Sequence, residues 1–443
     1  MPNRKLILWA LAAAFVAGDA GEDEIVERST RVLGKRWRWL RPVARRYIER
    51  FSTQVPPRRS EVVQFLAHDA GFQRAWIAHA AELRFAQWAS GAQEMRPSPA
   101  AAGWKVPEIE SVRALAEWLR LSESELEWFA DLKGIAARSA EPRLRHYWCR
   151  VLRKHSGGVR LIEAPKEFLK YIQRRILDEI LGPIPVHAAV HGFVKGRSIK
   201  TFAAPHVGRR VVLRMDLKEF FPSFGGRRIQ AFFRTAGYPE MVADLLGGLC
   251  TTATPRDVWK QSGLAMSGEQ IFAARQLYGR PHLPQGGPSS PALANLCAYR
   301  MDCRLNGLAE AAGATYTRYA DDLAFSGNET FERSVERFAA RAAAIAMEGG
   351  HAVHHRKTRI MRQSVRQYLA GVVTNERVNI VRADFDRWKA ILTNCVHHGS
   401  ASQNRENHPA FRMHLEGRVT FVEMINAQKG ARLRRIFERI EWS

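Results

Sequence analysis

Residues 318–326, which read Arg-Tyr-Ala-Asp-Asp-Leu-Ala-Phe-Ser, place two adjacent carboxylates between two strand-forming runs. The runs, residues 315–319 and 323–325, predict a tight hairpin with Asp321 and Asp322 at its tip. Adjacent buried carboxylates repel each other, and a divalent cation that binds both removes this repulsion. An acidic turn on a surface hairpin is the alternative, so the interpretation needs support from other parts of the chain.

A second segment, residues 211–222, reads Val-Val-Leu-Arg-Met-Asp-Leu-Lys-Glu-Phe-Phe-Pro. Its apolar run predicts a central strand that ends at Asp216 and supplies a third carboxylate. A two-magnesium phosphoryl-transfer site needs carboxylates from separate strands, with one Mg²⁺ activating the attacking 3′-hydroxyl and the other holding the triphosphate. We therefore expect Asp216 and Asp321 to be the metal ligands. Leu217 joins this metal-binding set, and Asp322 is a supporting ligand or a contact of the primer end.

A third segment, residues 283–295, reads Leu-Pro-Gln-Gly-Gly-Pro-Ser-Ser-Pro-Ala-Leu-Ala-Asn and lies between the other two. Gly286 and Gly287 permit a close approach of the backbone to a base pair, and Pro291 suits the first turn of a helix. Taken alone, this segment is equally well explained as a Gly/Pro-rich loop without a function. In this order, however, the three segments resemble the palm motifs of reverse transcriptases. The resemblance implies that Gln285 and Gly286 pack beneath the template and the incoming nucleotide.

Two further segments resemble the fingers motifs of retron reverse transcriptases. The first reads Gly-Gly-Val-Arg-Leu-Ile-Glu-Ala-Pro around Arg160, and the resemblance implies that Arg160 lies over the incoming triphosphate, with Lys154 as a second phosphate contact. The second, residues 191–199, reads His-Gly-Phe-Val-Lys-Gly-Arg-Ser-Ile, which makes Lys195 and Arg197 expected contacts of the template or the nucleotide. Without the resemblance, a basic surface turn explains this second segment.

Segments on both sides of the expected catalytic strands extend the resemblance. Residues 202–206 keep the histidine, His206, of the Asn-Ala-x-x-His element that most retron enzymes carry, although the Asn is replaced. Residues 355–358 resemble the motif with a lysine near the triphosphate, so Lys357 is the expected general acid for pyrophosphate departure. A solvated basic turn is the alternative for that motif. Residues 368–375 resemble the segment that closes the palm, although the usual Val-Thr-Gly is absent.

The C-terminal part of the chain resembles a helical thumb that grips the nucleic-acid duplex. Residues 415–419 and 426–430 carry this similarity, which makes Arg418 and Lys429 expected nucleic-acid contacts. The resemblance as a whole covers about residues 110–440 and leaves the first hundred residues unexplained.

Two aromatic residues, Phe220 and Phe221, follow Asp216 where reverse transcriptases carry a ring beneath the incoming sugar. A bulky ring in that position leaves no room for a 2′-hydroxyl. Phe221 is therefore the expected steric gate, and we expect a preference for deoxynucleotides. Core packing of at least one of the two rings is the alternative.

The composition indicates a polyanionic partner, because 68 Lys and Arg against 44 Asp and Glu give this chain of 443 residues a formal charge of +24. Nucleic acid is the expected partner, although an anionic membrane and simple solubility also fit a basic chain. Five cysteines, an odd number without a Cys-x-x-Cys pair, favour a reducing cytoplasm. Arg4 and Lys5 precede an apolar run, residues 6–17, that resembles a secretory signal, but we expect a buried or partner-facing helix there.

Cations alternate with aromatic residues between residues 28 and 47. In such a run the cations can pair with phosphates while the rings stack on unpaired bases. We therefore expect one RNA-gripping helix here, with Arg36, Arg38 and Arg41 as RNA contacts. A solvated or partner-facing basic helix is the alternative.

Together these segments predict an α+β right-hand polymerase with fingers, a palm that holds an antiparallel sheet, a helical thumb and a helical N-terminal extension. The spacing of apolar residues predicts a helix over residues 112–119, and a capping box from Ser122 to Glu125 opens the next one. Residues 96–103 are the expected linker after the extension. The expected boundaries are 1–100 for the basic helical extension, 101–210 for the helical lead-in and fingers, 211–377 for the palm with a fingers insertion at 225–285, and 378–443 for the thumb.

The resemblance implies a retron-type reverse transcriptase that copies a cognate structured non-coding RNA into DNA with deoxynucleotides and two Mg²⁺ ions. It further implies priming from a 2′-hydroxyl of that RNA, a branched RNA–DNA product, an effector protein as partner, and a role in phage defence in the cytoplasm without membrane contact. Other bacterial reverse transcriptases, namely group II intron, diversity-generating and abortive-infection enzymes, are alternatives. An RNA-binding scaffold without catalysis is the alternative from a different class.

Overall fold

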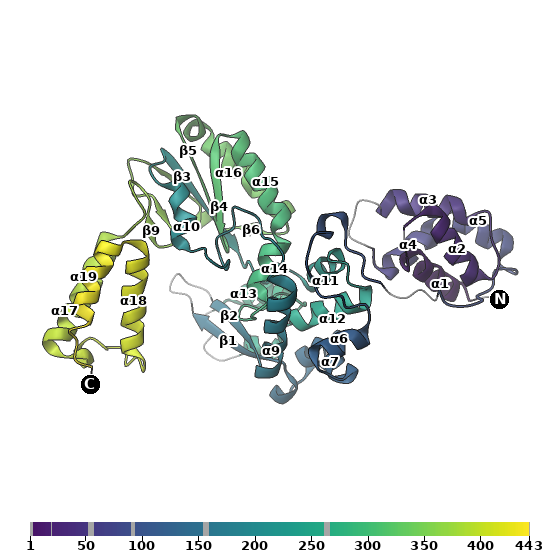
Figure 1. Cartoon of the computed structure of the whole chain (residues 1–443), viewed down its shortest axis with the longest axis horizontal. Helices are drawn as coiled ribbons and strands as arrows, with labels where there is room; N and C mark the ends of the chain where they lie inside the picture. Colours follow the sequence, from purple (N-terminus) through teal and green to yellow (C-terminus); the bar gives the residue numbers. More distant parts are fainter. Residues whose placement is uncertain are drawn as a thin grey trace. The chain divides into compact units, whose positions relative to one another are not determined.

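The computed structural model describes residues 3–18, 20–51, 57–89, 94–153, 159–260 and 266–442. Helices predominate, and all strand pairs of the named sheets are antiparallel (Figure 1). The chain forms two compact units: the first unit is Met1–Pro185 with Phe224–Leu293, and the second unit is Val186–Ser223 with Ala294–Ser443. The predicted mixed α+β class with N-terminal helices is thus confirmed. Within the described ranges, no helix combines the length and the hydropathy needed to span a bilayer.

The first unit begins with five helices that enclose an apolar core. The predicted apolar run forms the first of them, where Ile7 and Leu11 are 1% and 0% exposed. The side chain of Asn3 caps this helix by accepting hydrogen bonds from the backbone N–H groups of Lys5 and Leu6. A buried helix was one of the two expected outcomes for this run, and it is confirmed. The five helices are α1 (Arg4–Val16), α2 (Glu22–Leu33), α3 (Leu40–Phe51), α4 (Arg59–His68) and α5 (Ala70–His79).

The basic and aromatic run of residues 28–47 differs from its prediction. It is divided between two helices, because α2 ends before Gly34, which has a φ of 67°, and α3 begins at Leu40. Trp37 and Tyr47 are 7% and 4% exposed and belong to the apolar core. The expectation of one helix with rings free to stack on bases is therefore wrong: the run is divided between two helices, and Trp37 and Tyr47 are buried, while Trp39 is partly buried.

The rest of the first unit is mainly helical, with one hairpin. Residues 96–103, the expected linker, are attached to the unit: Arg96 N–H donates to the Gly237 carbonyl at 2.8 Å. The helix predicted at 112–119 and the Ser122 capping box are both confirmed. The elements are η1 (Pro99–Ala101), α6 (Val112–Leu119), α7 (Glu123–Ala130), α8 (Ile135–Arg138), η2 (Pro142–Leu144), β1 (Tyr147–Arg153), β2 (Val159–Pro165), α9 (Glu167–Arg175), the π-helix η3 (Ile176–Leu181), α11 (Gly226–Thr235), α12 (Glu240–Cys250), η5 (Arg256–Lys260) and α13 (Gly268–Tyr278).

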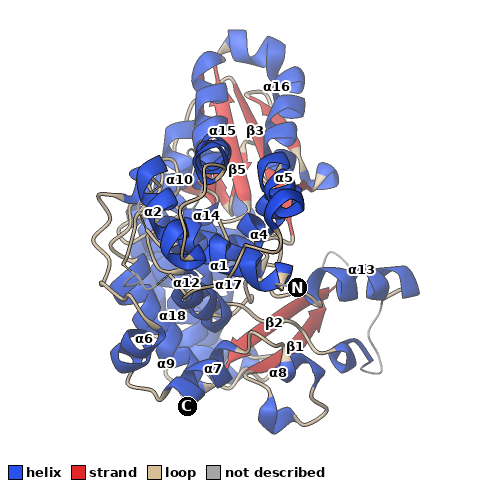
Figure 2. Cartoon of the chain, turned by 90° about the vertical axis from the view of Figure 1, so that its right-hand side faces the viewer, coloured by secondary structure: helices blue, strands red, loops and turns tan. Residues whose placement is uncertain are grey.

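The second unit is built on a five-stranded antiparallel sheet in the order β4-β5-β3-β6, in which β7 also pairs with β3. Figure 2 shows β3 and β5 of this sheet in red. The predicted central strand is β3, which lies between β5 on one side and both β6 and β7 on the other. Helices α15 and α16 pack on the sheet. The elements are β3 (Val211–Lys218), β4 (Ala314–Tyr319), β5 (Asp322–Gly327), β6 (Ala352–Val353), β7 (Arg359–Arg362), α10 (Ile199–Ala203), η4 (Ala204–His206), α15 (Tyr299–Ala311), α16 (Glu329–Glu348) and η6 (His355–Lys357). Helix α14 (Ser290–Cys297) connects the first unit to the second along the chain.

The C-terminal part of the second unit is helical, as predicted. Leu415 and Val419 of one helix and Leu433 of the next are buried in an apolar core that also contains Val212 of β3. A three-stranded sheet in the order β10-β9-β8 precedes these helices. The elements are β8 (Tyr368–Leu369), β9 (Val372–Val373), β10 (Asn379–Ile380), α17 (Arg382–His398), η7 (Ser400–Ser402), α18 (Phe411–Ile425) and α19 (Ala427–Phe437).

Candidate active site

The acidic hairpin predicted from the sequence is present in the second unit. Strands β4 and β5 pair so that Tyr319 lies opposite Asp322, and the turn between them consists of Ala320 and Asp321. Ala320 adopts a left-handed φ of 54°, which lets the chain reverse in two residues. Asp321 is therefore in the turn, as expected, whereas Asp322 is the first residue of β5.

The third carboxylate lies beside the other two, because the central strand carries it to the same end of the sheet. In the pairing of β3 with β5, Asp216 is directly opposite Asp322. Side chains of opposite residues in a strand pair point to the same face, so these two carboxylates share a face of the sheet. The backbone N–H of Leu217 donates to the carbonyl oxygen of Asp321 at 2.9 Å. The structure thus brings together the acids that the sequence analysis selected.

Burial and mutual repulsion raise the pKa of two of these acids. The pKa of Asp321 is raised to about 6, mainly by burial and in addition by the negative charges of Asp322 and Asp216. Burial also raises the pKa of Asp322, while the guanidinium of Arg214 opposes the shift. A bound cation would relieve the repulsion within this group.

Two cationic side chains compensate part of the negative charge. Lys357 Nζ donates to both carboxylate oxygens of Asp216, at 2.9 and 3.2 Å. Arg214 Nε donates to Asp322 Oδ1 at 2.8 Å. The backbone places Lys357 here, because the N–H of His354, just before η6, donates to the carbonyl oxygen of Asp216 at 2.7 Å. Lys357 is 50% exposed, so its ammonium group can separate from Asp216 without losing contact with water.

The donor atoms of this group suit a hard cation such as Mg²⁺, which prefers carboxylate oxygens and keeps several waters or phosphate oxygens in its shell. In the described part of the chain, no three or more His, Cys, Asp or Glu side chains form a ready-made metal site. Asp216 and Asp321 would therefore supply part of a coordination shell, and substrate or water oxygens would supply the rest. The fit rests on chemistry: these carboxylates are buried, adjacent and only partly compensated.

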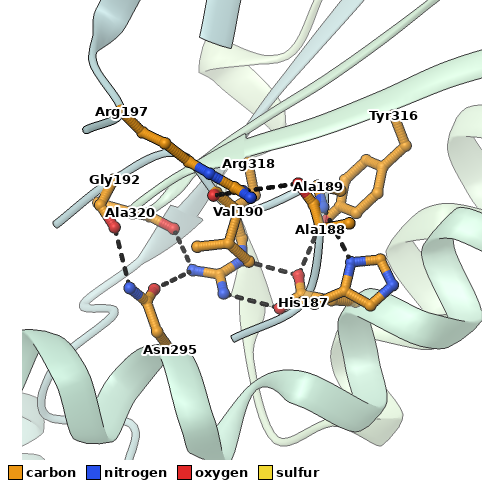
Figure 3. A network of polar contacts seen from close by, with 11 residues as sticks. His187, Ala188, Ala189, Val190, Gly192, Arg197, Asn295, Tyr316, Arg318 and Ala320 are labelled. Carbon is orange, nitrogen blue, oxygen red and sulfur yellow. Dashed lines mark hydrogen bonds and ion pairs between the residues drawn. The ribbon is translucent and has the colours of Figure 1, made fainter. Parts of the chain in front are cut away.

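A buried arginine holds the acidic turn from within the second unit (Figure 3). Arg318, on β4, is 0% exposed and forms an ion pair with Asp302 of α15, with Nε and Nη2 both 2.7 Å from its carboxylate oxygens. Its Nη1 donates to the carbonyl oxygen of Ala320 at 3.1 Å and to Asn295 Oδ1 at 3.0 Å. The turn that carries Asp321 is therefore fixed to a buried charge pair.

The same network connects the turn to the predicted second fingers motif. Asn295 Nδ2 donates to the carbonyl oxygen of Gly192 at 2.9 Å. The backbone of Gly192 lies so close to the turn that a Cβ on it would be 2.5 Å from the Ala320 nitrogen. Only glycine fits at this position without a shift of the backbone.

The two basic residues of that motif lie in different surroundings. Arg197 Nη1 donates to the carbonyl oxygen of Ala188 at 2.6 Å and also to that of Val190 (Figure 3). Part of its guanidinium is thus used inside the protein, which weakens its prediction as a nucleic-acid contact. Lys195 is exposed and stays a predicted contact.

Arg318 and Asn295 lie within the motifs, but the sequence indicated no role for either of them, and it did not indicate Asp302. One feature of the sequence could have indicated Arg318. It is a charged residue in a predicted strand, separated from Asp321 of the acidic turn by Tyr319 and Ala320. Its partner Asp302 lies on α15, and no local pattern connects the two.

His206, the retained histidine of the retron element, lies under the hairpin. Its Nδ1 is 2.7 Å from Ser326 Oγ, and its Nε2 is 2.7 Å from Thr317 Oγ1, one on each strand of the hairpin. Burial lowers the pKa of His206 to about 3, so the ring is neutral at physiological pH. It therefore acts as a neutral cross-link between β4 and β5.

The two phenylalanines after Asp216 differ in burial. Phe220 is 5% exposed, and its ring centroid lies 5.7 Å from that of His351. For this residue the core-packing alternative is confirmed. Phe221 is only half-buried, with its ring centroid 6.1 Å from that of the exposed Phe193. Phe221 stays the predicted steric gate.

The predicted nucleotide contacts of the first unit lie along β2. Arg160 is an exposed residue of that strand, and Glu163 N–H donates to the carbonyl oxygen of Gln285 at 3.0 Å. Gly286 has a φ of 140°, and a Cβ on it would be 2.8 Å from the carbonyl oxygen of Glu163. The close approach predicted for this glycine is thus made to the backbone of β2. Lys154 lies outside the described residues.

The remaining predicted nucleic-acid contacts lie near the two ends of the chain. Arg418 of α18 is 5.1 Å from the Trp388 ring, and Lys429 of α19 is 5.1 Å from the Phe385 ring. Near the N-terminus, Arg36 and Arg38 are exposed in the connection between α2 and α3. Arg41 forms ion pairs with the acidic first turn of α2, through the residues Glu22 and Asp23.

Comparison with known proteins gives a consistent assignment. The family model "Reverse transcriptase (RNA-dependent DNA polymerase)" matches residues 152–373. The retron Mx65 reverse transcriptase of Myxococcus xanthus is 42% identical over 295 residues, which are 66% of this chain and 64% of that protein. The retron Mx162 reverse transcriptase of the same organism is 34% identical over 73% of this chain and 65% of that protein. The retron Ec86 reverse transcriptase of Escherichia coli is 28% identical over 64% of this chain and 77% of that protein.

The matched segment contains all three acids and the lysine beside them, so the chain belongs to the reverse transcriptase family. Within the family, the resemblance to retron enzymes that the sequence motifs indicated is confirmed by these relatives. The chain spans slightly less than two thirds of the length of the Mx65 and Mx162 enzymes. Reverse transcriptases generally use a divalent metal ion, which agrees with the acidic character of the site.

Proposed function

We propose that this protein is an RNA-directed DNA polymerase of the retron type. The observation that carries the proposal is the convergence of Asp216, Asp321 and Asp322 at one end of the β3–β5 strand pair, inside the segment that matches the family. The substrates are an RNA template with its primer end and deoxynucleoside triphosphates. The reaction is nucleotidyl transfer with release of pyrophosphate.

Asp216 and Asp321 would hold two Mg²⁺ ions, with Leu217 next to them and Asp322 as a supporting ligand. Bound Mg²⁺ would activate the 3′-hydroxyl of the primer and compensate the negative charge that develops on the triphosphate. Lys357 can give a proton to the departing pyrophosphate, because its ammonium group already lies at Asp216 and is half exposed.

The remaining site residues have proposed roles in binding. Phe221 would exclude the 2′-hydroxyl of a ribonucleotide. Phe221→Val should then raise ribonucleotide incorporation. Unchanged sugar selection in this variant would show that Phe221 does not have this role. For the triphosphate and the base pair we propose Arg160, Lys154, Gln285 and Gly286. For the nucleic-acid strands we propose Lys195, Arg197, Arg36, Arg38, Arg41, Arg418 and Lys429.

In this proposal the architecture is a right-hand polymerase. The five-stranded sheet of the second unit is the palm, the β1–β2 hairpin belongs to the fingers, and α17 to α19 form the thumb. The proposed boundaries follow those expected from the sequence, at residues 100, 210 and 377.

The biological setting follows from the retron relatives. The template is a cognate structured RNA, priming uses a 2′-hydroxyl within it, and the product is DNA linked to RNA. A phage-defence role with an effector protein in the cytoplasm belongs to the same proposal. Sequencing the nucleic acid that copurifies with the protein tests this part, since a short single-stranded DNA joined to RNA is expected and its absence would argue for another reverse transcriptase type.

Primer extension on an RNA template tests the polymerase activity. Asp321→Asn keeps the size of the side chain but removes its charge, and loss of several kcal/mol of transition-state stabilisation should lower the rate about a thousandfold. Asp386→Asn, a change at an exposed acid of α17, is the matched control and should extend primers like the wild type. Equal, background-level synthesis by the wild type and Asp321→Asn would favour a scaffold that binds RNA without copying it.

A further inference from the structure

A cavity of about 540 Å³ lies in the N-terminal helical module, residues 3–89, between the α2–α3 connection and helices α3 and α5. Its lining contains basic side chains from all three of these segments and no carboxylate among the described residues. The excess of positive charge predicts an anionic ligand. The basic lining residues are Lys35, Arg36, Arg38, Arg46, Arg74 and His79.

Not all of these cations are neutralised inside the protein. Arg46 is held by Asp69, with Nε and Nη2 at 2.7 and 2.9 Å from the carboxylate oxygens, and Lys35 pairs with Glu82 at 3.3 Å. In the part of the chain that the structure describes, Arg36, Arg38 and Arg74 take part in no ion pair. Arg74 Nε donates only to the carbonyl oxygen of Ala70, at 3.2 Å. Three guanidinium groups are thus available to an anion.

Two tryptophans also line the cavity. The indole nitrogens of Trp37 and Trp39 are both buried and have no hydrogen-bond partner among the described residues. Trp37 is only 7% exposed, so water does not easily replace the missing acceptor. A buried donor without an acceptor costs free energy.

We propose that this cavity binds phosphate groups of RNA. Arginine side chains present planar donor pairs that match phosphate oxygens. The volume exceeds what one inorganic ion needs, which fits a segment of a polynucleotide. The inference rests on the proposed function, in which the protein works on RNA, and it adds a site outside the catalytic unit, within residues that the family model does not cover.

RNA affinity of the full chain tests the proposal, measured by fluorescence anisotropy with a short fluorescein-labelled oligouridylate and no nucleotides present. The variant Arg36→Gln/Arg38→Gln/Arg74→Gln removes the three free guanidinium groups and should weaken binding about tenfold. The slope of log affinity against log salt should fall by about 2, as expected for three lost phosphate contacts on a single strand. An unchanged thermal midpoint would establish that the variant is folded.

A control variant removes the same charge from the same module. Lys5, Arg50 and Arg84 are exposed and do not line the cavity, so Lys5→Gln/Arg50→Gln/Arg84→Gln should change RNA affinity less than about twofold. An equal loss in both variants would mean diffuse attraction by net charge and would overturn the proposal. Unchanged RNA affinity of the cavity variant would overturn it as well.

Cross-linking identifies the bound surface directly and separates RNA from other anions. A 4-thiouridine oligomer irradiated with the full chain should label peptides that contain Trp37, Trp39 or Arg74. Labels confined to the second unit would contradict the proposal. It would also be contradicted if the cavity variant bound RNA normally but no longer bound phosphatidylglycerol vesicles. If Asp321→Asn abolishes extension while the cavity variant binds RNA normally, the polymerase function stands and only this site is excluded.

Discussion

Two ion pairs flank the proposed catalytic acids, and they differ in their exposure to solvent. In the Arg318–Asp302 pair both side chains are 0% exposed, whereas in the Lys357–Asp216 pair the lysine is 50% exposed. A buried pair cannot separate without leaving a charge uncompensated, but an exposed lysine can exchange a carboxylate for water or phosphate at little cost. The buried pair therefore fixes the turn, and the exposed pair keeps Asp216 available to a cation.

Breaking the buried pair should have the largest effect on stability. Arg318→Met leaves the buried Asp302 carboxylate with no cationic partner and only the Tyr316 hydroxyl as a side-chain donor, and we expect a loss of about 3–5 kcal/mol of unfolding free energy in denaturant titration. The double variant Arg318→Met/Asp302→Leu should recover part of that stability, because it removes the uncompensated charge but leaves the buried Tyr316 hydroxyl without its acceptor. Because it still lacks the donor to the Ala320 carbonyl, it should extend primers more slowly than the wild type. Full activity in the stable double variant would show that the network does not position the turn.

Breaking the Lys357–Asp216 pair should affect catalysis more than stability. Lys357→Met should lower kcat in primer extension about a hundredfold or more, as expected when a general acid is lost. The thermal midpoint should fall less than in Arg318→Met, because the lysine of this pair is half exposed, although the Asp216 side chain is only 8% exposed. Lys357→Arg tests the role, since its guanidinium keeps the charge but does not release a proton. If Lys357→Arg restored kcat, the role of Lys357 would be electrostatic compensation alone. Lys200→Met, at an exposed lysine of the same unit, is the control and should leave kcat unchanged.

A methyl group at Gly192 should disturb the connection between the turn and the second fingers motif. The added Cβ in Gly192→Ala would lie 2.5 Å from the Ala320 nitrogen, so the backbone must move, at a cost of about 1–3 kcal/mol. The rate of primer extension by Gly192→Ala should also fall, because the backbone shift moves the turn that carries Asp321. Gly307→Ala is the matched control in the same unit, because a Cβ there meets nothing within 4 Å and alanine favours the helix. Equal stability of both variants would contradict the close approach.

The neutral histidine under the hairpin predicts a smaller, pH-dependent effect. Because the folded pKa of His206 is about 3, below its usual value, the unfolded chain binds a proton first as the pH falls below about 6.5. Stability is therefore fully present above that pH and falls below it, by at most about 1.4 kcal/mol per pH unit. His206→Gln should reduce the slope between pH 6.5 and 5, measured by denaturant unfolding, whereas His398→Gln at an exposed site should not. An unchanged slope in His206→Gln would mean that folding does not lower the pKa of His206.

The acids of the site could be predicted from the sequence because local patterns determine their placement. An apolar run identified β3, a tight turn between strand-forming runs identified the hairpin, and one register then brings Asp216 opposite Asp322. The capping residues likewise identified helix starts such as Ser122. Each of these features depends on neighbours in the chain.

The features that the sequence did not reveal depend on contacts between distant segments. Arg318 and Asp302 are partners only because α15 packs on β4, and Gly286 approaches the backbone of β2. In the N-terminal module, alternating cations and rings suggested an RNA-facing helix, but the pattern does not tell which rings are covered by other helices. Trp37 is buried among them, and only the structure places Arg74 beside Arg36 and Arg38.

The central claim is that Asp216 and Asp321 hold a divalent cation together. Crystals of the protein soaked in Mn²⁺, which replaces Mg²⁺ and scatters anomalously, test it most directly. An anomalous peak within bonding distance, about 2.0–2.3 Å, of oxygens from both residues is expected, and Asp321→Asn crystals should lack it. A fully occupied peak elsewhere, with both carboxylates free of metal, would contradict the account.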